Sequence, residues 1–424
     1  LLPAEESFYR WIEPVRDGWG AVVCAGPAFL ARRSAIDSVG GFKEQAISED
    51  FVTGLRLRRK GWKLLYLQQK LSAGLAAETM ADFVRQRQRW ANGTLQSLRL
   101  SDGPLGPGEL RVGERMAYLE GVVHWFNNMP RLVLMLMPLS YGLLGIIPIL
   151  LNSQAALTLL LPLWGLQVLT LGWLNRGSRT AFLSELTGWV LTVPLTLTVF
   201  TNLMGYIGGF RVTPKHQKRN RGSFSLVLVI PLLALLLLNL INLFGLVTTT
   251  PLDSEILDSR PLGLTWAVIN LLSLWIALRA CWDPPARDPA PWQAACLPAE
   301  LEDSDGERRP CRITALSESG AELELVTPLP AELKITQLRW TADVSPLPVI
   351  WERTQGNRLA LRWQDLSDQT RQQLILWLFC RPGCWPERQA PPEWRALIAL
   401  ISRLFILPSR RPFHRCLMPQ TPPQ

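Results

Sequence analysis

Long apolar stretches separated by short polar ones fill the middle of the chain, whereas both flanks mix the two kinds of residue. A helix that crosses a bilayer needs about 20 apolar residues, and four stretches reach that length, at 130–150, 155–174, 224–247 and 262–280. A fifth stretch, 181–207, also carries Glu185, Pro194 and several threonines, which are costly in lipid as part of one continuous helix. The pattern predicts a membrane region between two flanks of globular sequence.

The charges of the connecting loops predict which side of the membrane each one faces, because cytoplasmic loops carry an excess of Lys and Arg. Residues 175–179 and 211–221 are basic, whereas 248–261 holds three acids and a single Arg260. Four spans place both basic loops in the cytoplasm and the acidic loop outside. If 181–207 also crossed, the basic linkers would lie on opposite sides, so we interpret it as a helix along the cytoplasmic interface or packed inside the protein. Both flanks are then cytoplasmic.

Two elements are predicted in the N-terminal flank. Alternating residues at 21–30 predict a strand, and the pattern at 48–60 predicts a helix. Ser48 is the expected N-cap, which places Glu49 and Asp50 in the first turn, where free N–H groups and the helix dipole favour negative charge. Acids in a first turn are commonplace, so on this pair alone we favour the interpretation that they only stabilise the start of the helix.

A second helix is predicted where Gln86, Arg89 and Trp90 fall at positions i, i+3 and i+4 and therefore share one face. An indole offers an apolar plane to the C–H face of a sugar ring, and Arg and Gln supply donors for hydroxyl or phosphate oxygens. This combination suits a sugar polymer. Taken singly, an amphipathic helix with Trp90 in a core is the safer interpretation.

Taken together, these motifs resemble those of the processive family 2 glycosyltransferases, and among them the bacterial cellulose synthase catalytic subunits. Residues 48–50 match the family's T/S-E-D, 86–90 match Q-x-x-R-W, and 210–215 match the gating loop F-x-V-T-x-K, in the family's order and spacing. The resemblance runs through nearly the whole chain, because the family also places four spans after its catalytic domain, an interface helix before the gating loop and a cytoplasmic PilZ barrel last.

The resemblance implies a role for each matching residue. Asp50 would be the general base that takes the proton of the acceptor hydroxyl as it attacks the anomeric carbon of UDP-glucose, forming a β-1,4 bond with inversion. Trp90 would be the acceptor platform at the mouth of the channel, while Gln86 and Arg89 would help to hold the terminal sugar and the diphosphate. The other residues implied to contact substrate are Glu49, Cys24 and, in the gating loop, Phe210, Val212, Thr213 and Lys215.

The chain departs from the family in two places. Residues 22–26 stand where the family has F-F-C-G-S beside the acceptor, but only Cys24 is kept, and a buried core strand is the other interpretation. The family binds uridine and Mg²⁺ through upstream aspartates that include a D-x-D pair, whereas the only such pair here, Asp303 and Asp305, reads as a solvated loop. The chain begins at Leu1, so we expect an N-terminally truncated fragment without ligands for Mg²⁺ and inactive alone.

Beyond Pro284-Pro285, short alternating runs at 311–313, 322–326, 334–340 and 359–363, with a turn at 356–357, predict a small antiparallel barrel. It resembles PilZ, a cyclic di-GMP receptor with R-x-x-x-R and D-x-S-x-x-G motifs. Ser317 and Gly320 are kept, but Ala315 replaces the Asp and only Arg287 lies near the position of the arginines. Two guanidiniums would grip the dinucleotide, so we expect cyclic di-GMP to bind weakly or not at all.

An amphipathic helix is predicted from Trp394 to Phe405, either on the membrane surface or packed against the barrel. Composition supports a membrane protein, since 48% of residues are apolar and 19% charged, against roughly 25% charged in soluble domains. The net charge of +9 is accounted for by basic cytoplasmic loops and not by a nucleic acid partner. The seven cysteines lack the spacing of a disulfide framework or a zinc site.

The sequence therefore predicts a multi-domain membrane protein with four regions. They are part of an α/β glycosyltransferase domain of the GT-A type at 1–115, a transmembrane region at 116–282 with the interface helix 181–207 and the gating loop 208–222, a PilZ-like barrel at 283–366, and C-terminal helices and a tail at 367–424. The resemblance implies a cellulose synthase of the bacterial inner membrane, with membrane lipid and a periplasmic cellulose synthase subunit as partners. The alternatives are a non-catalytic membrane scaffold, a synthase of another β-linked polysaccharide, and a solute transporter, which the cytoplasmic motifs disfavour.

Overall fold

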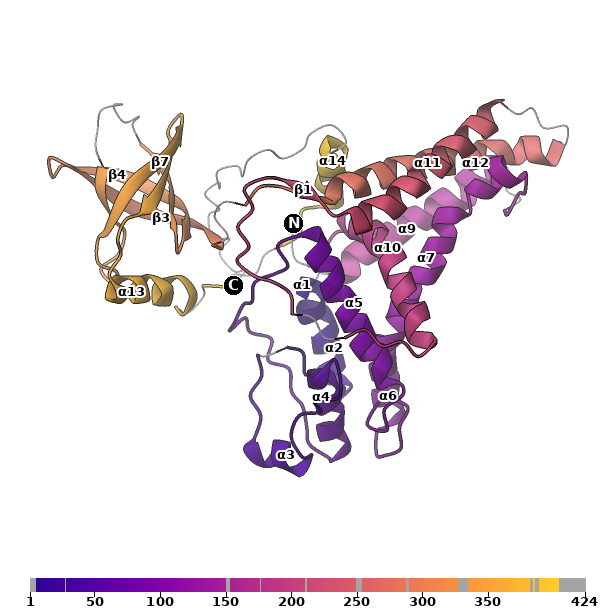
Figure 1. Cartoon of the computed structure of the whole chain (residues 1–424), viewed down its shortest axis with the longest axis horizontal. Coiled ribbons are helices and arrows are strands. Elements are labelled where there is room, and N and C mark those ends of the chain that lie inside the picture. Colours follow the sequence, from indigo (N-terminus) through magenta and orange to yellow (C-terminus); the bar gives the residue numbers. More distant parts are fainter. Residues whose placement is uncertain are drawn as a thin grey trace.

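The computed structural model describes residues 5–26, 28–149, 153–175, 177–209, 212–248, 254–286, 290–326, 335–381, 384–385 and 389–403. Figure 1 shows three parts, with the barrel at one end of the long axis, the long apolar helices at the other, and the N-terminal block between them. The chain thus forms an N-terminal block, a region of long apolar helices and a barrel, in the order that the sequence predicts.

The N-terminal block consists of short helices and extended chain. Its elements are α1 (Glu5–Ser7), the π-helix η1 (Phe8–Ile12), α2 (Glu13–Gly18), α3 (Arg33–Ser38), α4 (Glu49–Arg59), α5 (Met80–Ser97) and α6 (Val112–Val123). The two helices predicted around residues 48–60 and 86–90 are confirmed as α4 and α5. Ser48 holds the N-cap position of α4, but the expected cap bond is absent, because its side chain makes no hydrogen bond to the helix start.

The strand predicted at 21–30 is wrong. Residues 21–25 and 28–32 have no regular secondary structure and belong to no sheet in the described part of the chain. Side chains from α2, α4 and α6 bond to the main chain of 21–26 in the place of a neighbouring strand. The alternation does not mark a strand here, because the polar main-chain groups are satisfied by side chains of helices.

Four helical stretches in the described residues are long and apolar enough to cross a membrane. They are Ala156–Leu174, which joins the π-helix η4 (Ala156–Leu160) to α9 (Leu161–Leu174), then α10 (Ala181–Leu203), α11 (Leu226–Thr248) and Arg260–Ala280 within α12 (Ser254–Ala280). Three of them match predicted spans. The prediction of a single helix at 130–150 is wrong. Helix α7 (Asn128–Leu136) ends within this range and is followed by the π-helix η3 (Ser140–Leu144). Gly145, at φ +64°, then ends the helical backbone.

Helix α10 is the fourth of these stretches, although the loop charges predict a helix at 181–207 that lies along the interface or inside the protein and does not cross the membrane. It is the most enclosed of the four, with 44% of its most apolar window buried, against 0, 22 and 33% in the others. Two of its polar residues bond to α5, since Gln88 donates to the Thr198 hydroxyl at 3.1 Å and Asn202 donates to Asn92 Oδ1 at 3.0 Å. These contacts with α5 favour the interpretation that residues 181–207 pack inside the protein.

The predicted barrel is confirmed as a closed antiparallel barrel in the order β3-β4-β5-β8-β7-β6. Its strands are β3 (Trp292–Asp303), β4 (Arg308–Ser317), β5 (Gly320–Leu325), β6 (Ile335–Arg339), β7 (Leu347–Gln355) and β8 (Arg358–Trp363). Alternate residues such as Ile313, Leu338 and Leu361 are fully buried inside it. Helix α13 (Asp368–Phe379) packs Leu374 and Leu378 against this core.

The predicted amphipathic helix forms as α14 (Glu393–Arg403), and the remaining predicted residues lie outside the described ones. It packs against α10 and α12 and not on the barrel (Figure 1). Glu393 accepts the Ala181 N–H at 2.7 Å, so it caps the start of α10. Ala396 and Leu400 are buried, whereas Trp394 on the outer face is 58% exposed.

Candidate active site

Close contact between α4 and α5 brings the two sequence motifs together. A Cβ added to Gly93 of α5 would lie 2.0 Å from Ser48 Oγ, so the two helices touch where only a glycine fits. Gly93 follows Trp90 by three residues and Gln86 by seven, which places it on their face of α5. The Ser48-Glu49-Asp50 motif therefore begins α4 directly against the face that carries the Gln-x-x-Arg-Trp motif.

Asp50 is half-buried, and main-chain donors fix both of its oxygens. Oδ2 accepts the N–H of Gly26 at 2.7 Å, and Oδ1 accepts that of Phe51 at 2.8 Å. Each carboxylate oxygen has a further lone pair with which it can accept a proton or a hydroxyl. Glu49 beside it is exposed. The residue predicted as the base is thus held in one orientation and still reaches solvent.

The segment 21–26 runs past Asp50 and is also hydrogen-bonded to side chains of α2 and α6. The Tyr118 hydroxyl of α6 donates to the carbonyl of Val22 at 3.0 Å. The Val23 N–H donates to Glu13 Oε2 of α2 at 3.2 Å. Because every one of these bonds joins side chain to main chain, the side chains of the segment could change, as they have relative to F-F-C-G-S, without loss of its position.

Cys24 lies in this segment against α4, one turn beyond Asp50. A Cβ on Gly54 would lie 3.1 Å from Cys24 Cβ, so the thiol packs on the helix. Burial, with a contribution from the nearby carboxylates of Asp50 and Glu13, raises the pKa of Cys24 to about 12. A thiol with this pKa stays neutral at physiological pH, so Cys24 can contact substrate but cannot serve as a nucleophile.

The predicted substrate face of α5 is half-buried. Gln86, Arg89 and Trp90 are each partly exposed, and Trp90 packs one side against the core that includes Phe51. The buried guanidinium of Arg87 stands 4.3 Å from the centre of the Trp90 ring. Both interpretations of this tryptophan therefore hold in part, because it contacts the core and keeps exposed surface.

The described part of the predicted gating loop runs along α5. A Cβ on Gly208 would lie 2.7 Å from Asn92 Nδ2, so the loop starts beside α5. Val212 is exposed, Thr213 is half-buried, and Lys215 Nζ donates to the main-chain carbonyls of Leu75 and Ala76. Phe210 lies outside the described residues.

Glu78 holds this loop, and the sequence interpretation missed it. Its carboxylate accepts the N–H groups of His216 at 2.6 Å and Gln217 at 3.0 Å. His216 has φ +56°, a left-handed conformation that turns these N–H groups toward Glu78. A single acid before the Thr79 N-cap belongs to no sequence motif, so only the fold reveals its contact with the loop.

Near the start of α5, the predicted gating loop also contacts the linker that enters the barrel. Arg219 and Ala286 exchange main-chain hydrogen bonds at 2.8 and 2.9 Å, and the Met80 N–H at the start of α5 donates to Asp283 at 2.9 Å. Burial raises the pKa of Asp283. The predicted gating loop, the start of α5 and the barrel linker therefore meet at one point.

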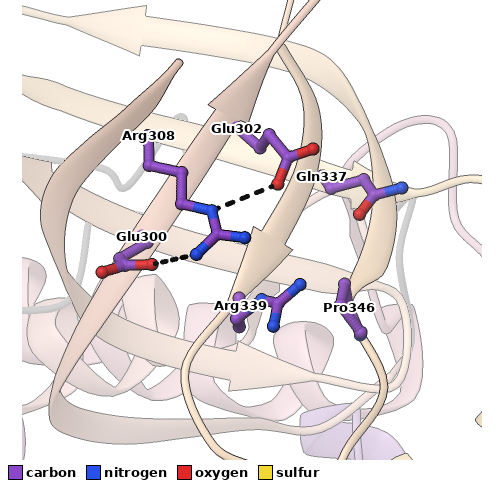
Figure 2. Close-up of a pocket in the computed structure, with 6 residues that line it drawn as sticks. All are labelled: Glu300, Glu302, Arg308, Gln337, Arg339 and Pro346. Carbon is purple, nitrogen blue, oxygen red and sulfur yellow. Dashed lines mark ion pairs between the residues drawn. The ribbon is translucent and has the colours of Figure 1, made fainter. Parts of the chain in front are cut away.

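The two retained PilZ-motif residues have structural roles in the barrel. The buried Ser317 accepts the Trp363 indole N–H at its carbonyl, at 2.9 Å, and a Cβ on Gly320 would lie 2.0 Å from the Leu361 carbonyl oxygen. Arg287 lies outside the described residues. At the opposite end of β4, a charged hollow on the barrel is lined by six residues (Figure 2). They are Glu300, Glu302, Arg308, Gln337, Arg339 and Pro346.

No group of three or more His, Cys, Asp or Glu side chains that could hold a metal ion occurs among the described residues. The interpretation of the Asp-x-Asp pair as a solvated loop is wrong for Asp303, which is 4% exposed. Asp303 Oδ1 accepts the N–H groups of Asp305 and Glu307 at 3.0 and 2.9 Å, so it holds the turn after β3. The described residues therefore do not fit Mg²⁺.

The chain is similar to several known proteins. It is 27% identical over 391 residues to the cellulose synthase 1 catalytic subunit [UDP-forming] of Komagataeibacter xylinus, covering 90% of this chain and 52% of that protein. It is 30% identical over 393 residues to cellulose synthase 2 of Novacetimonas hansenii, covering 90% of this chain and 24% of the relative. The chain thus spans about half, or less, of the length of these relatives.

A solved structure and a family model also match. The PilZ domain of CeSA from a cellulose-synthesizing bacterium is 21% identical, with a TM-score of 0.19, covering 20% of this chain and 93% of that domain. Residues 15–278 match the model of the glycosyl transferase family group 2. This match spans more than half of the chain and includes both motifs that meet at the contact of α4 with α5. The chain therefore belongs to the glycosyl transferase family group 2.

Proposed function

We propose that this chain carries the catalytic base, the acceptor site and the membrane passage of a processive inverting glycosyltransferase. The proposed reaction polymerises glucose from UDP-glucose into β-1,4-glucan, and the enzyme moves the polymer across the bacterial inner membrane. The names of the cellulose synthase relatives support the substrate and product classes. The apolar helices support the membrane passage.

Asp50 performs the chemical step in this proposal. It takes the proton of the acceptor hydroxyl while the hydroxyl oxygen bonds to the anomeric carbon and the bond from that carbon to UDP breaks. Attack from the side opposite UDP inverts the anomeric configuration. Proton transfer to a positioned carboxylate typically contributes about 10²–10⁴-fold in rate. Trp90 stacks on the terminal sugar of the acceptor with the part of its indole that remains exposed.

The approach of Gly93 to Ser48 is the observation that carries the proposal. It supports the proposal because Ser48, two residues before the fixed carboxylate of Asp50, lies against the helix that carries the amide–guanidinium–indole face. Either motif alone has an ordinary structural interpretation. A base next to a sugar platform is what transfer to a saccharide end requires.

The test is incorporation of labelled glucose from UDP-glucose into insoluble polymer, in membranes containing the complete reading frame that encodes this chain. Asp50→Asn is expected to lower synthesis at least about 100-fold without loss of membrane insertion. Asp37→Asn, an exposed acid in the same block, is the matched control and should retain full synthesis. Retained polymerisation by Asp50→Asn would refute the assignment, and a wild type that makes no polymer would favour the scaffold.

Sidedness and partners belong to the same proposal. The N-terminal block and the barrel lie in the cytoplasm, and a periplasmic synthase subunit receives the polymer. Cyclic di-GMP binds the barrel weakly or not at all, because Ala315 stands in the place of the motif aspartate and the retained Ser317 and Gly320 are engaged in the fold. Calorimetry should show no binding at micromolar nucleotide, and micromolar or tighter binding would overturn this expectation.

A further inference from the structure

A short piece of main chain connects two carboxyl groups on different helices. Val23 donates its N–H to Glu13 of α2 at 3.2 Å, and three residues later Gly26 donates its N–H to Asp50 of α4 at 2.7 Å. Only Cys24 and Ala25 separate the two donors, so a shift of the main chain at one end moves the other. Glu13 is therefore linked to the proposed base although it is remote in sequence.

The burial of Glu13 is unusual for an acid. The residue is 1% exposed, and its Oε1 is buried without a hydrogen-bond partner in the described part of the chain. An ionised carboxylate with one oxygen unsatisfied is costly in such a place, whereas the neutral acid is tolerated. Burial accordingly raises the pKa of Glu13 to about 7.

Charged and titratable groups face Glu13 from each element packed around it. On α2 itself, Arg16 lowers its pKa and Asp17 raises it. Arg16 makes its ion pair with Glu120 at 2.7 Å, so its charge is shared with a second acid. The other groups that interact electrostatically with Glu13 are Cys24 in the segment, Tyr66 in the extended stretch after α4, and Tyr118 on α6.

We propose that Glu13 is a positioning residue for Asp50, whose carboxyl group fixes residues 21–26 and through them the orientation of the proposed base. This inference rests on the proposed function for the role of Asp50, but the geometry of the segment is independent of it. Glu13 itself lies behind the segment and is not assigned any contact with substrate.

The protonation state of Glu13 sets how firmly the segment is held. Below pH 7 the neutral acid accepts the Val23 N–H without a buried charge. When the segment opens and Glu13 meets water, its pKa returns toward the ordinary value of 4.5, so opening becomes more favourable as the pH rises from about 4.5 to about 7 and changes little above that. Synthesis is therefore expected to decline over this range and to level off above pH 7.

Alkylation of Cys24 reports the position of the segment without any assay of synthesis. Membranes containing the complete reading frame are treated with iodoacetamide from pH 6 to 8.5, and each cysteine is quantified by mass spectrometry, with the exposed Cys380 as the internal reference. Glu13→Ala should raise relative labelling of Cys24 about tenfold, the effect on an equilibrium of losing one ordinary hydrogen bond. Glu13→Gln keeps an oxygen for the Val23 N–H and should label slowly at every pH.

The synthesis assay separates positioning from a merely structural role. Glu13→Ala should lower synthesis about tenfold at all pH values, whereas Glu13→Gln should approach the wild type near pH 5 and exceed it at pH 8. Asp37→Asn, an exposed acid of the same block that pairs with Arg33, is the control and should behave as the wild type. Equal loss in both Glu13 variants would overturn the proposal.

The two proposals can fail separately. If Asp50→Asn abolishes synthesis while Glu13→Ala changes neither labelling nor synthesis, the positioning role is wrong and the proposed function stands. If Asp50→Asn retains synthesis while Glu13→Ala still exposes Cys24, Glu13 positions the segment but Asp50 is not the base. Unchanged pH dependence of synthesis in Glu13→Gln would refute the role of the carboxyl proton.

Discussion

In the barrel, every strand is hydrogen-bonded to a strand on each side, whereas residues 21–26 of the N-terminal block have no strand beside them among the described residues. The barrel main chain is thus satisfied by a repeated ladder that depends little on any single side chain. The main chain of 21–26 depends on three particular side chains, from Glu13, Asp50 and Tyr118. Single polar substitutions should therefore act strongly in the block and weakly in the barrel.

The first prediction tests the difference between the two regions by removing volume from the barrel core. Leu338 is fully buried there, so Leu338→Ala should lower the free energy of unfolding of the barrel by about 2–5 kcal/mol. Hydrogen exchange of barrel amides measures it, with the half-exposed Leu376→Ala of α13 as the control. Equal acceleration of exchange in residues 21–26 would contradict the independence of the two regions.

The second prediction concerns the contact of α4 with α5. A Cβ at position 93 meets Ser48 Oγ at 2.0 Å, so Gly93→Ala should destabilise the block by about 1–3 kcal/mol through overpacking and reduce synthesis. Protease resistance of the block measures the first effect. Adding Ser48→Gly should restore part of it. Gly165→Ala in α9 has open space around its Cβ and should be tolerated.

The third prediction compares one hydrogen bond in each region. Tyr118→Phe leaves the Val22 carbonyl without its donor and should weaken the segment by about 1 kcal/mol. Thr314→Val removes a bond of similar length, 3.1 Å, to the Glu322 carbonyl in the barrel, where the β4–β5 ladder persists. Exchange rates near each site should rise more in the first variant. Equal effects would remove the distinction between the regions.

The smallest effect is expected at the gating loop. Glu78→Ala removes the acceptor of the His216 and Gln217 N–H groups. Because these groups lie near the surface, the free energy that holds the loop in place should fall by about 0.5–1 kcal/mol. Faster proteolytic cleavage within 212–219 is the measurement. Glu44→Ala, an exposed acid of the same block, is the control. A loop that is cleaved no faster would show that Lys215 holds it without Glu78.

Elements with a strong local pattern could be predicted from the sequence. The helices that carry Asp50 and Trp90 and the alternating strands of the barrel follow their own periodicity. The segment 21–26 has the alternation of a strand, but its partners are side chains distant in the sequence, which periodicity does not report. The break near Gly145 and the burial of α10 likewise depend on how neighbouring helices pack.

Part of the candidate site was equally beyond sequence reasoning. Asp50, Gln86, Arg89 and Trp90 belong to recognisable motifs. Their meeting depends on Gly93, whose importance lies in the space it leaves. Glu13 and Glu78 act through main-chain N–H groups, and such contacts leave no spacing rule in the sequence, because any fold that brings an acid to an amide will form them.

The closure of the barrel limits how other molecules can recognise it. Since β3 pairs with β6, the ring of strands presents no open border to which a foreign peptide could add as a further strand. A ligand or protein must instead read the outward-pointing side chains or the connecting turns. Recognition can thus drift, be lost or be reacquired through surface replacements, while the ladder beneath them stays the same.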